Sequence, residues 1–159
     1  MTTTLPLTAP TRAERAGRGV AITFLVLLGL GALAGGIALV SAPDGSAMGF
    51  RTSLLAGSPF PDYLVPGLVL GGLFGIGSLA AAWLGWRRHP VAPFLAFAIG
   101  SAQMIWIIVQ LAIIGTENLS FLHPAMFLVG LIIAVAAVPW GLPALRARRA
   151  GQSGRAAAA

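Results

Sequence analysis

The sequence contains no cysteine and no lysine, and only four of its 159 residues are acidic. The missing thiols exclude disulfide bonds, thiolate metal sites and cysteine redox chemistry. Charged residues of both signs make up only 9% of the chain, whereas a soluble domain has roughly a quarter. Because 57% of the residues are hydrophobic, we expect a single-domain protein whose main solvent is lipid.

Four long apolar runs have the length of membrane spans. A spanning helix needs about 20 mostly apolar residues to cross a hydrocarbon core of roughly 30 Å. Backbone groups find no water in that core, so each run is expected to be helical. The predicted spans cover residues 20–40, 63–86, 91–115 and 121–140, with a connection at 41–62. The sequence therefore predicts an all-α fold, a four-helix transmembrane bundle within residues 20–145.

The arginines predict how the bundle is oriented. Nine of the ten flank the spans on what becomes one membrane face if the spans alternate, namely Arg12, Arg15, Arg18, Arg87, Arg88, Arg146, Arg148, Arg149 and Arg155. Only Arg51 lies on the other face. Basic residues are retained in the cytoplasm during insertion, so both termini are expected inside, in the cell membrane. This placement also explains the net charge of +6, and we expect no nucleic-acid partner.

The ends of the chain allow two further expectations. Residues 1–19 and 146–159 are polar or rich in Ala and Gly, without apolar periodicity, and are expected to be disordered cytoplasmic tails. The first span has an alternative interpretation as a cleaved signal peptide, because the apolar run ends in Val40-Ser41-Ala42. Its apolar run is longer than the usual 7 to 15 residues, and Pro43 would directly follow the cut.

Small residues recur at helical spacing in every span. Helices in lipid associate through close van der Waals contact, which small residues permit. The predicted helix-packing glycines are Gly31, Gly35, Gly67, Gly71, Gly75 and Gly130. The stripe of Gly67, Gly71 and Gly75 has two open interpretations, packing within the monomer or a face for self-association. The long connection at 41–62 is likewise either a plain connector or a segment with a short helix that folds over the outer end of the bundle.

Polar residues inside a membrane are costly and mark candidate functional sites. Gln103, Trp106 and Gln110 are spaced three and four residues apart, which places them on one helical face. Glu117 is expected near the outer end of that helix, and His123 at the same level at the start of the next span, so the two could meet. One interpretation is a small polar cavity that binds a quinone, a lipid head group or a small solute. The other is that the two glutamines form interhelical hydrogen bonds of about 1 kcal/mol each, while Trp106 packs.

Several kinds of chemistry have no support in the sequence. The only two histidines, His89 and His123, are predicted on opposite membrane faces, so they cannot jointly bind a metal ion or haem. No acidic residue lies within a predicted span, which argues against ion transport by a buried acid. No paired carboxylates or Ser/His/Asp set is expected on one side. We therefore predict no enzyme, no metal and no cofactor.

The stretch from Ser58 to Gly67 (SPFPDYLVPG), followed by Ile105 to Gln110 (IWIIVQ), resembles small uncharacterised four-span membrane proteins of GC-rich bacteria. The resemblance covers most of the chain from the first loop onward and implies a single compact bundle. It implies no activity. The expected function is that of an accessory or structural membrane protein that contacts lipids and another membrane protein or itself. The alternative is a small binding or transport protein that uses the polar face of the third span.

Overall fold

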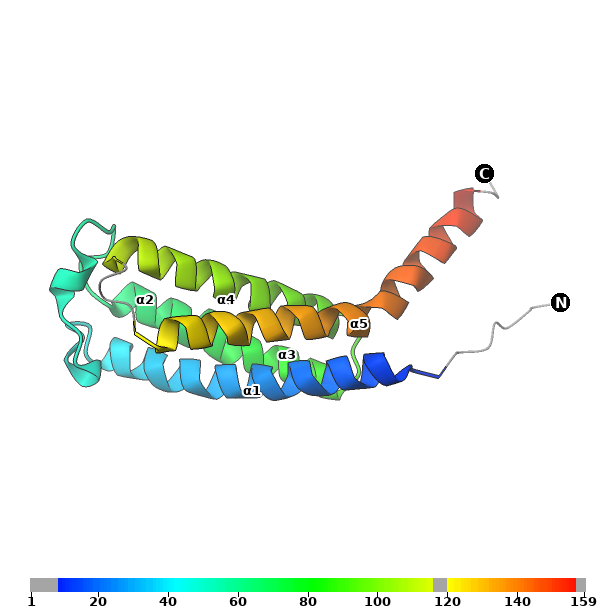
Figure 1. Ribbon diagram of the computed structural model, residues 1–159, viewed down its shortest axis with the longest axis horizontal. Coiled ribbons are helices and arrows are strands. Elements are labelled where there is room, and N and C mark those ends of the chain that lie inside the picture. The colour runs from blue at the N-terminus through cyan, green and yellow to red at the C-terminus, as the bar shows by residue number, and fades with distance from the viewer. Residues whose placement is uncertain (1–8, 116–119, 157–159) are drawn as a thin grey trace.

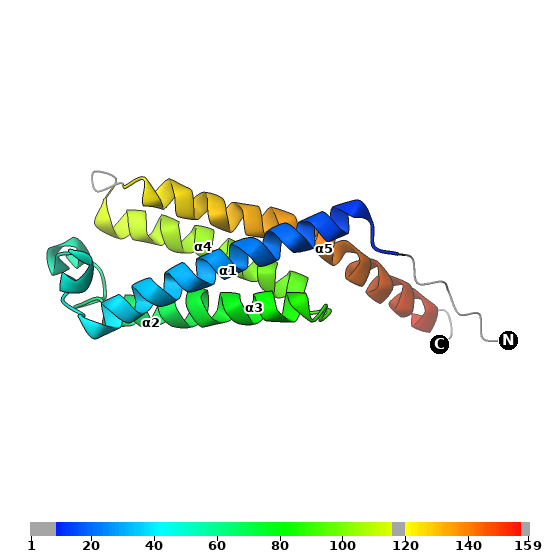
Figure 2. The ribbon, with the colours of Figure 1, turned by 90° about the horizontal axis from the view of Figure 1, so that it is seen from below.

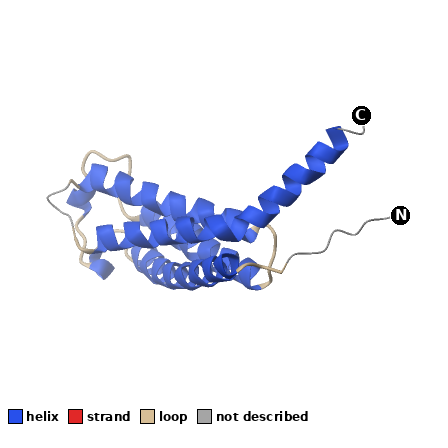
Figure 3. Ribbon diagram, turned by 45° about the vertical axis from the view of Figure 1, so that its right-hand side comes forward, coloured by secondary structure: helices blue, strands red, loops and turns tan. Residues whose placement is uncertain are grey.

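The computed structural model describes residues 9–115 and 120–156, and these ranges contain helices and turns but no strand (Figure 3). Four helices are long and apolar enough to span a membrane, as the sequence predicted. They comprise Arg12–Ser41, Leu64–Trp86, Ala92–Ile113 and Leu122–Leu142. The all-α fold and the four candidate spans are therefore confirmed.

The helices are joined by one long and two short connections. Helix α1 covers Arg12–Ser41, and the short 3₁₀ helices η1 and η2 cover Ser46–Met48 and Thr52–Leu55. The second span consists of α2 (Leu64–Val69), the π-helical segment η3 (Leu70–Ile76) and α3 (Gly77–Trp86). Helix α4 covers Ala92–Ile114, and α5 covers Leu122–Ala156.

The four spans form a closed ring in which each packs against two neighbours. Helix α1 lies between the second span and α5, while α4 lies between α3 and α5. Figures 1 and 2 show the long 41–63 connection at one end of the ring, here called the loop end. The opposite end, here called the Arg-rich end, holds the start of α1 and the α3–α4 turn with Arg12, Arg15, Arg18, Arg87 and Arg88.

The core of the ring consists of small and aliphatic side chains. Leu25, Phe74 and Ile133 are its largest fully buried apolar members. Much of the remainder is alanine, at Ala32, Ala81, Ala82, Ala96 and Ala137. Because these side chains are short, the helix backbones approach one another closely.

Glycine forms the contact between α1 and the second span. A Cβ added to Gly36 would lie 2.5 Å from both the Cα and the backbone nitrogen of Gly71. A Cβ added to Gly67 would likewise crowd the side chain of Leu39, and one added to Gly75 would crowd that of Leu33. The stripe of Gly67, Gly71 and Gly75 therefore packs within the monomer, and α1 occupies the face that self-association would need.

The predicted packing role of Gly31 is wrong for the described part of the chain, because no atom lies within 4 Å of a Cβ added there. Gly35 touches only a methyl group of Leu70. The glycines of α1 that meet the backbone of the second span are Gly29 and Gly36, which are separated by two helical turns. In the other hairpin, Gly130 packs directly against the carbonyl oxygen of Gly100.

Both predicted tails are partly helical, contrary to expectation. Helix α1 begins at Arg12 because Thr11 and Glu14 form a capping box, in which each side chain accepts a hydrogen bond from the other residue's backbone N–H. Helix α5 continues to Ala156 through a stretch rich in Ala and Arg, two residues with high helix propensity. Arg146, Arg148 and Arg149 lie on this extension, which leaves the bundle at an angle in Figure 1.

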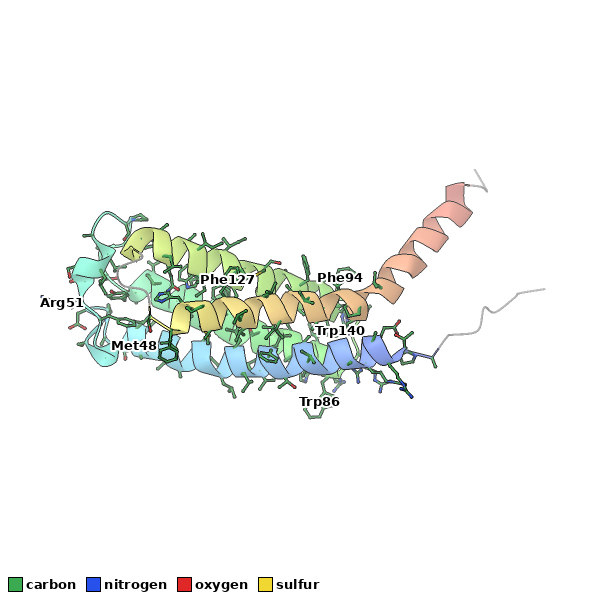
Figure 4. The ribbon with its side chains drawn as sticks, in the orientation of Figure 1. Met48, Arg51, Trp86, Phe94, Phe127 and Trp140 are labelled. Carbon is green, nitrogen blue, oxygen red and sulfur yellow. The ribbon has the colours of Figure 1, made fainter. Side chains whose placement is uncertain are left out.

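The long connection folds over the loop end rather than passing freely across it. Leu55 and Tyr63 are buried with Leu39 of α1, and the Tyr63 hydroxyl donates a hydrogen bond of 2.9 Å to the carbonyl oxygen of Arg51. The hydroxyl and backbone N–H of Ser46 donate to Asp44 and lower the pKa of that carboxyl below its usual value. The connection is therefore an ordered cap with two 3₁₀ turns. Figure 4 labels Met48 and Arg51 at this end.

Candidate functional site

The predicted polar face of α4 is mostly part of the packed interior. Gln103 is only 2% exposed, while Trp106 and Gln110 are half-buried. The Trp106 ring lies 5.9 Å from the ring of Phe74, centroid to centroid, in a tilted arrangement. Gln103 packs against α5, since a Cβ added to Gly130 would lie 3.2 Å from the Cβ of Gln103. Trp106 and Gln103 therefore bridge α4 to two neighbouring helices.

The remaining two residues of the predicted polar site do not join this face. Glu117 lies outside the described residues. His123 is half-buried in the first turn of α5, and its Nδ1 accepts a hydrogen bond of 3.1 Å from the backbone N–H of Ser120. In the described ranges the hydrogen bonds of its side chain are all to Ser120. His123 therefore serves as a local cap for the start of α5.

Two buried polar atoms in the centre of the bundle have no hydrogen-bond partner among the described residues. They are the side-chain oxygen Oε1 of Gln103 and the hydroxyl oxygen of Ser78, which come from the adjacent helices α4 and α3. A buried polar group left unpaired costs about 1–3 kcal/mol. The predicted interhelical hydrogen bond through Oε1 of Gln103 is absent from the described structure.

Replacing Gln103 with leucine is expected to raise the stability of the bundle by about 1 kcal/mol, because a side chain of similar size removes the unpaired oxygen. Unfolding by SDS in mixed micelles, followed by tryptophan fluorescence, measures this change. Gln110→Leu is the matched control and should have a smaller effect, since Gln110 is only half-buried. A loss of stability in Gln103→Leu would show that the amide has a partner in the membrane.

A long apolar groove runs between α1 and α5, here called the α1–α5 groove. It is a shallow, open depression of about 570 Å³ that reaches from the middle of α5 to the start of α1. Its floor is the contact of Gly17 with Ala136 and Pro139. The lining is apolar throughout and consists of Ala13, Ala16, Gly17, Val20, Leu131, Ile132, Val135, Ala136 and Pro139.

A second hollow, of about 250 Å³, lies at the Arg-rich end and is here called the basic hollow. Its lining combines the first turns of α1, the α3–α4 turn and the indole of Trp140, which Figure 4 shows at this end of the bundle. The lining residues are Pro10, Glu14, Arg15, Arg18, Arg88, His89, Pro90, Pro93 and Trp140. Three arginines and one glutamate thus line a single hollow.

Of the predicted site residues that the structure describes, Gln103, Trp106, Gln110 and His123, none lines either hollow. The two hollows use opposite faces of α1, with Ala13, Gly17 and Val20 on one and Glu14 and Arg18 on the other. Arg15, Arg18 and Arg88 were assigned from sequence to membrane topology alone. The sequence signal for the hollow was the clustering of arginine on two segments that the fold brings together.

The described residues contain no group of three His, Asp or Glu side chains that could hold a metal ion. Comparison of the chain with protein-family models, with curated proteins and with solved structures finds no match.

Proposed function

We propose that this chain is an accessory subunit of the cell membrane, with the Arg-rich end inside, which binds one transmembrane helix of a different membrane protein in the α1–α5 groove. The observation that carries the proposal is the groove itself, an open apolar depression at the surface of an otherwise closely packed ring. Alanine and glycine along its α1 side allow another backbone to approach closely.

The position of the groove favours a protein helix over lipid. Helix α1 has 30 residues and is therefore about 45 Å long, whereas the hydrocarbon core measures roughly 30 Å. The groove extends to Ala13 and Ala16, which share their helical turns with Arg12 and Arg15. The acyl chains of lipids lie in the hydrocarbon core and do not reach the level of the charged groups. They would therefore leave the part of the groove at Ala13 and Ala16 unfilled. A partner helix can continue past that level.

The shape of the groove favours a different protein over a second copy. A symmetric dimer places the same patch of both subunits in contact, so the patch has to be self-complementary. Two concave grooves facing each other enclose a void and bury little surface. The convex flank of an unrelated helix fills the same space.

Photo-crosslinking from the groove tests the proposal. A benzophenone amino acid at Val135, which is 60% exposed and lines the groove, is compared with one at Ile105, which is 61% exposed on α4. We expect Val135 alone to crosslink to one defined membrane protein. Ala16→Phe should fill the groove and reduce that product at least about fivefold, since blocking one packed helix face removes roughly 1 kcal/mol or more.

Ala34→Phe is the matched control, because Ala34 is exposed on α1 outside the groove. Crosslinking to a second copy of the chain, or to lipid alone, would contradict the proposal. So would equal yields from Val135 and Ile105.

The proposed orientation has its own test, helped by the absence of native cysteine. Ala9→Cys lies beside the Arg-rich end and Ala47→Cys lies in the loop, and both alanines are exposed. In intact cells, a membrane-impermeant maleimide should label Ala47→Cys only. Labelling of Ala9→Cys under the same conditions would reverse the orientation.

A further inference from the structure

We propose that the basic hollow binds the phosphate group of an anionic phospholipid from the leaflet at the Arg-rich end. This site is separate from the α1–α5 groove and does not depend on the function proposed for it. The inference rests on unpaired positive charge, on the conformation of Arg88 and on the level of the hollow in the bundle.

The guanidinium groups of the hollow are available to an anion. Those of Arg15, Arg18 and Arg88 form no hydrogen bond or ion pair with any residue in the described ranges. Arg18 is half-buried, so part of its hydration is already lost. The single carboxylate, that of Glu14, is engaged in the capping box through a 3.1 Å hydrogen bond from the backbone N–H of Thr11. The hollow therefore has an excess of positive charge, and guanidinium groups bind phosphate in a bidentate manner.

Arg88 occupies a backbone conformation that normally belongs to glycine. Its φ is 56°, the only positive φ of a non-glycine residue in the described part of the chain. The α3 helix ends in a Schellman motif, in which the N–H of His89 donates to the carbonyl oxygen of Leu84 and that of Arg88 donates to Gly85. Glycine is the usual residue at this position because it avoids the steric strain. The chain instead places an arginine there, and that arginine lines the hollow.

The hollow lies at the level where lipid phosphates are found. It is formed by the first turns of α1 and α4 and by the turn between α3 and α4. Trp140 lines it, and Trp86 projects outward at the same end with 79% of its surface exposed (Figure 4). Tryptophan is enriched at the head-group level, and basic pockets between spanning helices bind anionic head groups.

The size of the hollow fits such a group. Its volume of about 250 Å³ far exceeds the roughly 10–15 Å³ that a single water molecule requires. A phosphodiester with its glycerol fits in that space. The acyl chains of the same lipid would then continue along the apolar surface of the helices toward the loop end.

Lipid binding to the full chain in detergent tests the inference. The purified, delipidated protein is titrated with phosphatidylglycerol or phosphatidylcholine and the adducts are counted by native mass spectrometry. We expect a clear preference for phosphatidylglycerol. Arg88→Gly and Arg18→Gln should each weaken its binding about fivefold, which corresponds to about 1 kcal/mol per arginine near a membrane surface.

Arg88→Gly separates binding from folding, since glycine relieves the strain at this position while it removes the guanidinium. Arg87→Gln is the matched control, because Arg87 neighbours Arg88 in sequence but stacks on the Trp83 ring, 5.4 Å from its centroid, outside the hollow. Its effect should stay below twofold. An equal loss in Arg87→Gln would overturn the inference, because it would indicate diffuse surface attraction.

Inorganic phosphate distinguishes a lipid from a soluble anion as the ligand. If millimolar phosphate displaces phosphatidylglycerol completely, with the same dependence on Arg18 and Arg88, the lipid assignment is overturned in favour of a soluble phosphate compound. Retention of the phosphatidylglycerol preference in phosphate supports the lipid. Unchanged binding in both Arg18→Gln and Arg88→Gly would overturn the site itself.

Discussion

Gly36→Ala is expected to destabilise the bundle by about 3 kcal/mol, at the upper part of the usual range for overpacking. The added Cβ would lie 2.5 Å from the Cα and nitrogen of Gly71 and 2.9 Å from the carbonyl oxygen of Gly67. All three are backbone atoms, so no side-chain rotation can relieve the contact. Helix α1 has to move away from the second span, which separates the other contacts along this interface. SDS-driven unfolding in mixed micelles measures the loss.

Gly31→Ala is the control on the same helix, since no atom lies within 4 Å of the Cβ it introduces. It should be neutral or stabilising by up to about 1 kcal/mol, because alanine has the higher helix propensity. Gly71→Ala provides a second comparison, because its Cβ would meet Gly36 at an ordinary distance of 3.5 Å. Similar stabilities of Gly36→Ala and Gly31→Ala would mean that α1 and the second span do not meet at Gly36.

Gly100→Ala is expected to cause a loss of similar size, about 3 kcal/mol, in the other hairpin. Its Cβ would lie 2.6 Å from the carbonyl oxygen of Gly130 and 2.8 Å from the backbone nitrogen of Ala134. Because α4 and α5 have to separate, Gln103 also loses its contact with Gly130. The same micelle assay applies, with emission from Trp106 expected to shift as its environment loosens.

Gly19→Ala is the control for this substitution, because a Cβ at Gly19 has no atom within 4 Å. The double variant Gly36→Ala with Gly100→Ala should show nearly additive losses, since the two substitutions affect different helix pairs. A Gly100→Ala protein as stable as Gly19→Ala would contradict the close approach of α4 to α5.

The sequence was sufficient to predict the spans but not how they pack. Long apolar runs determine the existence of spanning helices, and those predictions are confirmed. The start of α1 was predicted too late, at residue 20 instead of Arg12, because the capping-box spacing of Thr11 and Glu14 was overlooked. The error at Gly31 has a different origin. Gly31 and Gly35 have a favourable spacing, but which side of a helix faces its neighbour depends on the other helices, and only the structure shows it.

Prediction of the candidate sites from the sequence was limited in the same way as prediction of the packing. Helical spacing grouped Gln103 with Trp106 and Gln110 on one face, and the structure shows that Gln103 is 2% exposed. Spacing does not reveal whether the space beside a buried amide is open or filled, and here Gly130 of α5 lies against Gln103 and Met104 of α4. The basic hollow depends on Arg18 and Arg88, which are 70 positions apart in the chain. Their proximity follows from the closed ring and could not be read from either segment alone.

The glycine contact between α1 and the second span also affects how the protein responds to bilayers of different thickness. Individual helices normally adjust to hydrophobic mismatch by changing their tilt. Here the backbones of Gly36 and Gly71 touch, so neither helix can tilt without the other. A thinner or thicker membrane therefore acts on α1 and the second span as one unit, and the lipid around them has to deform instead.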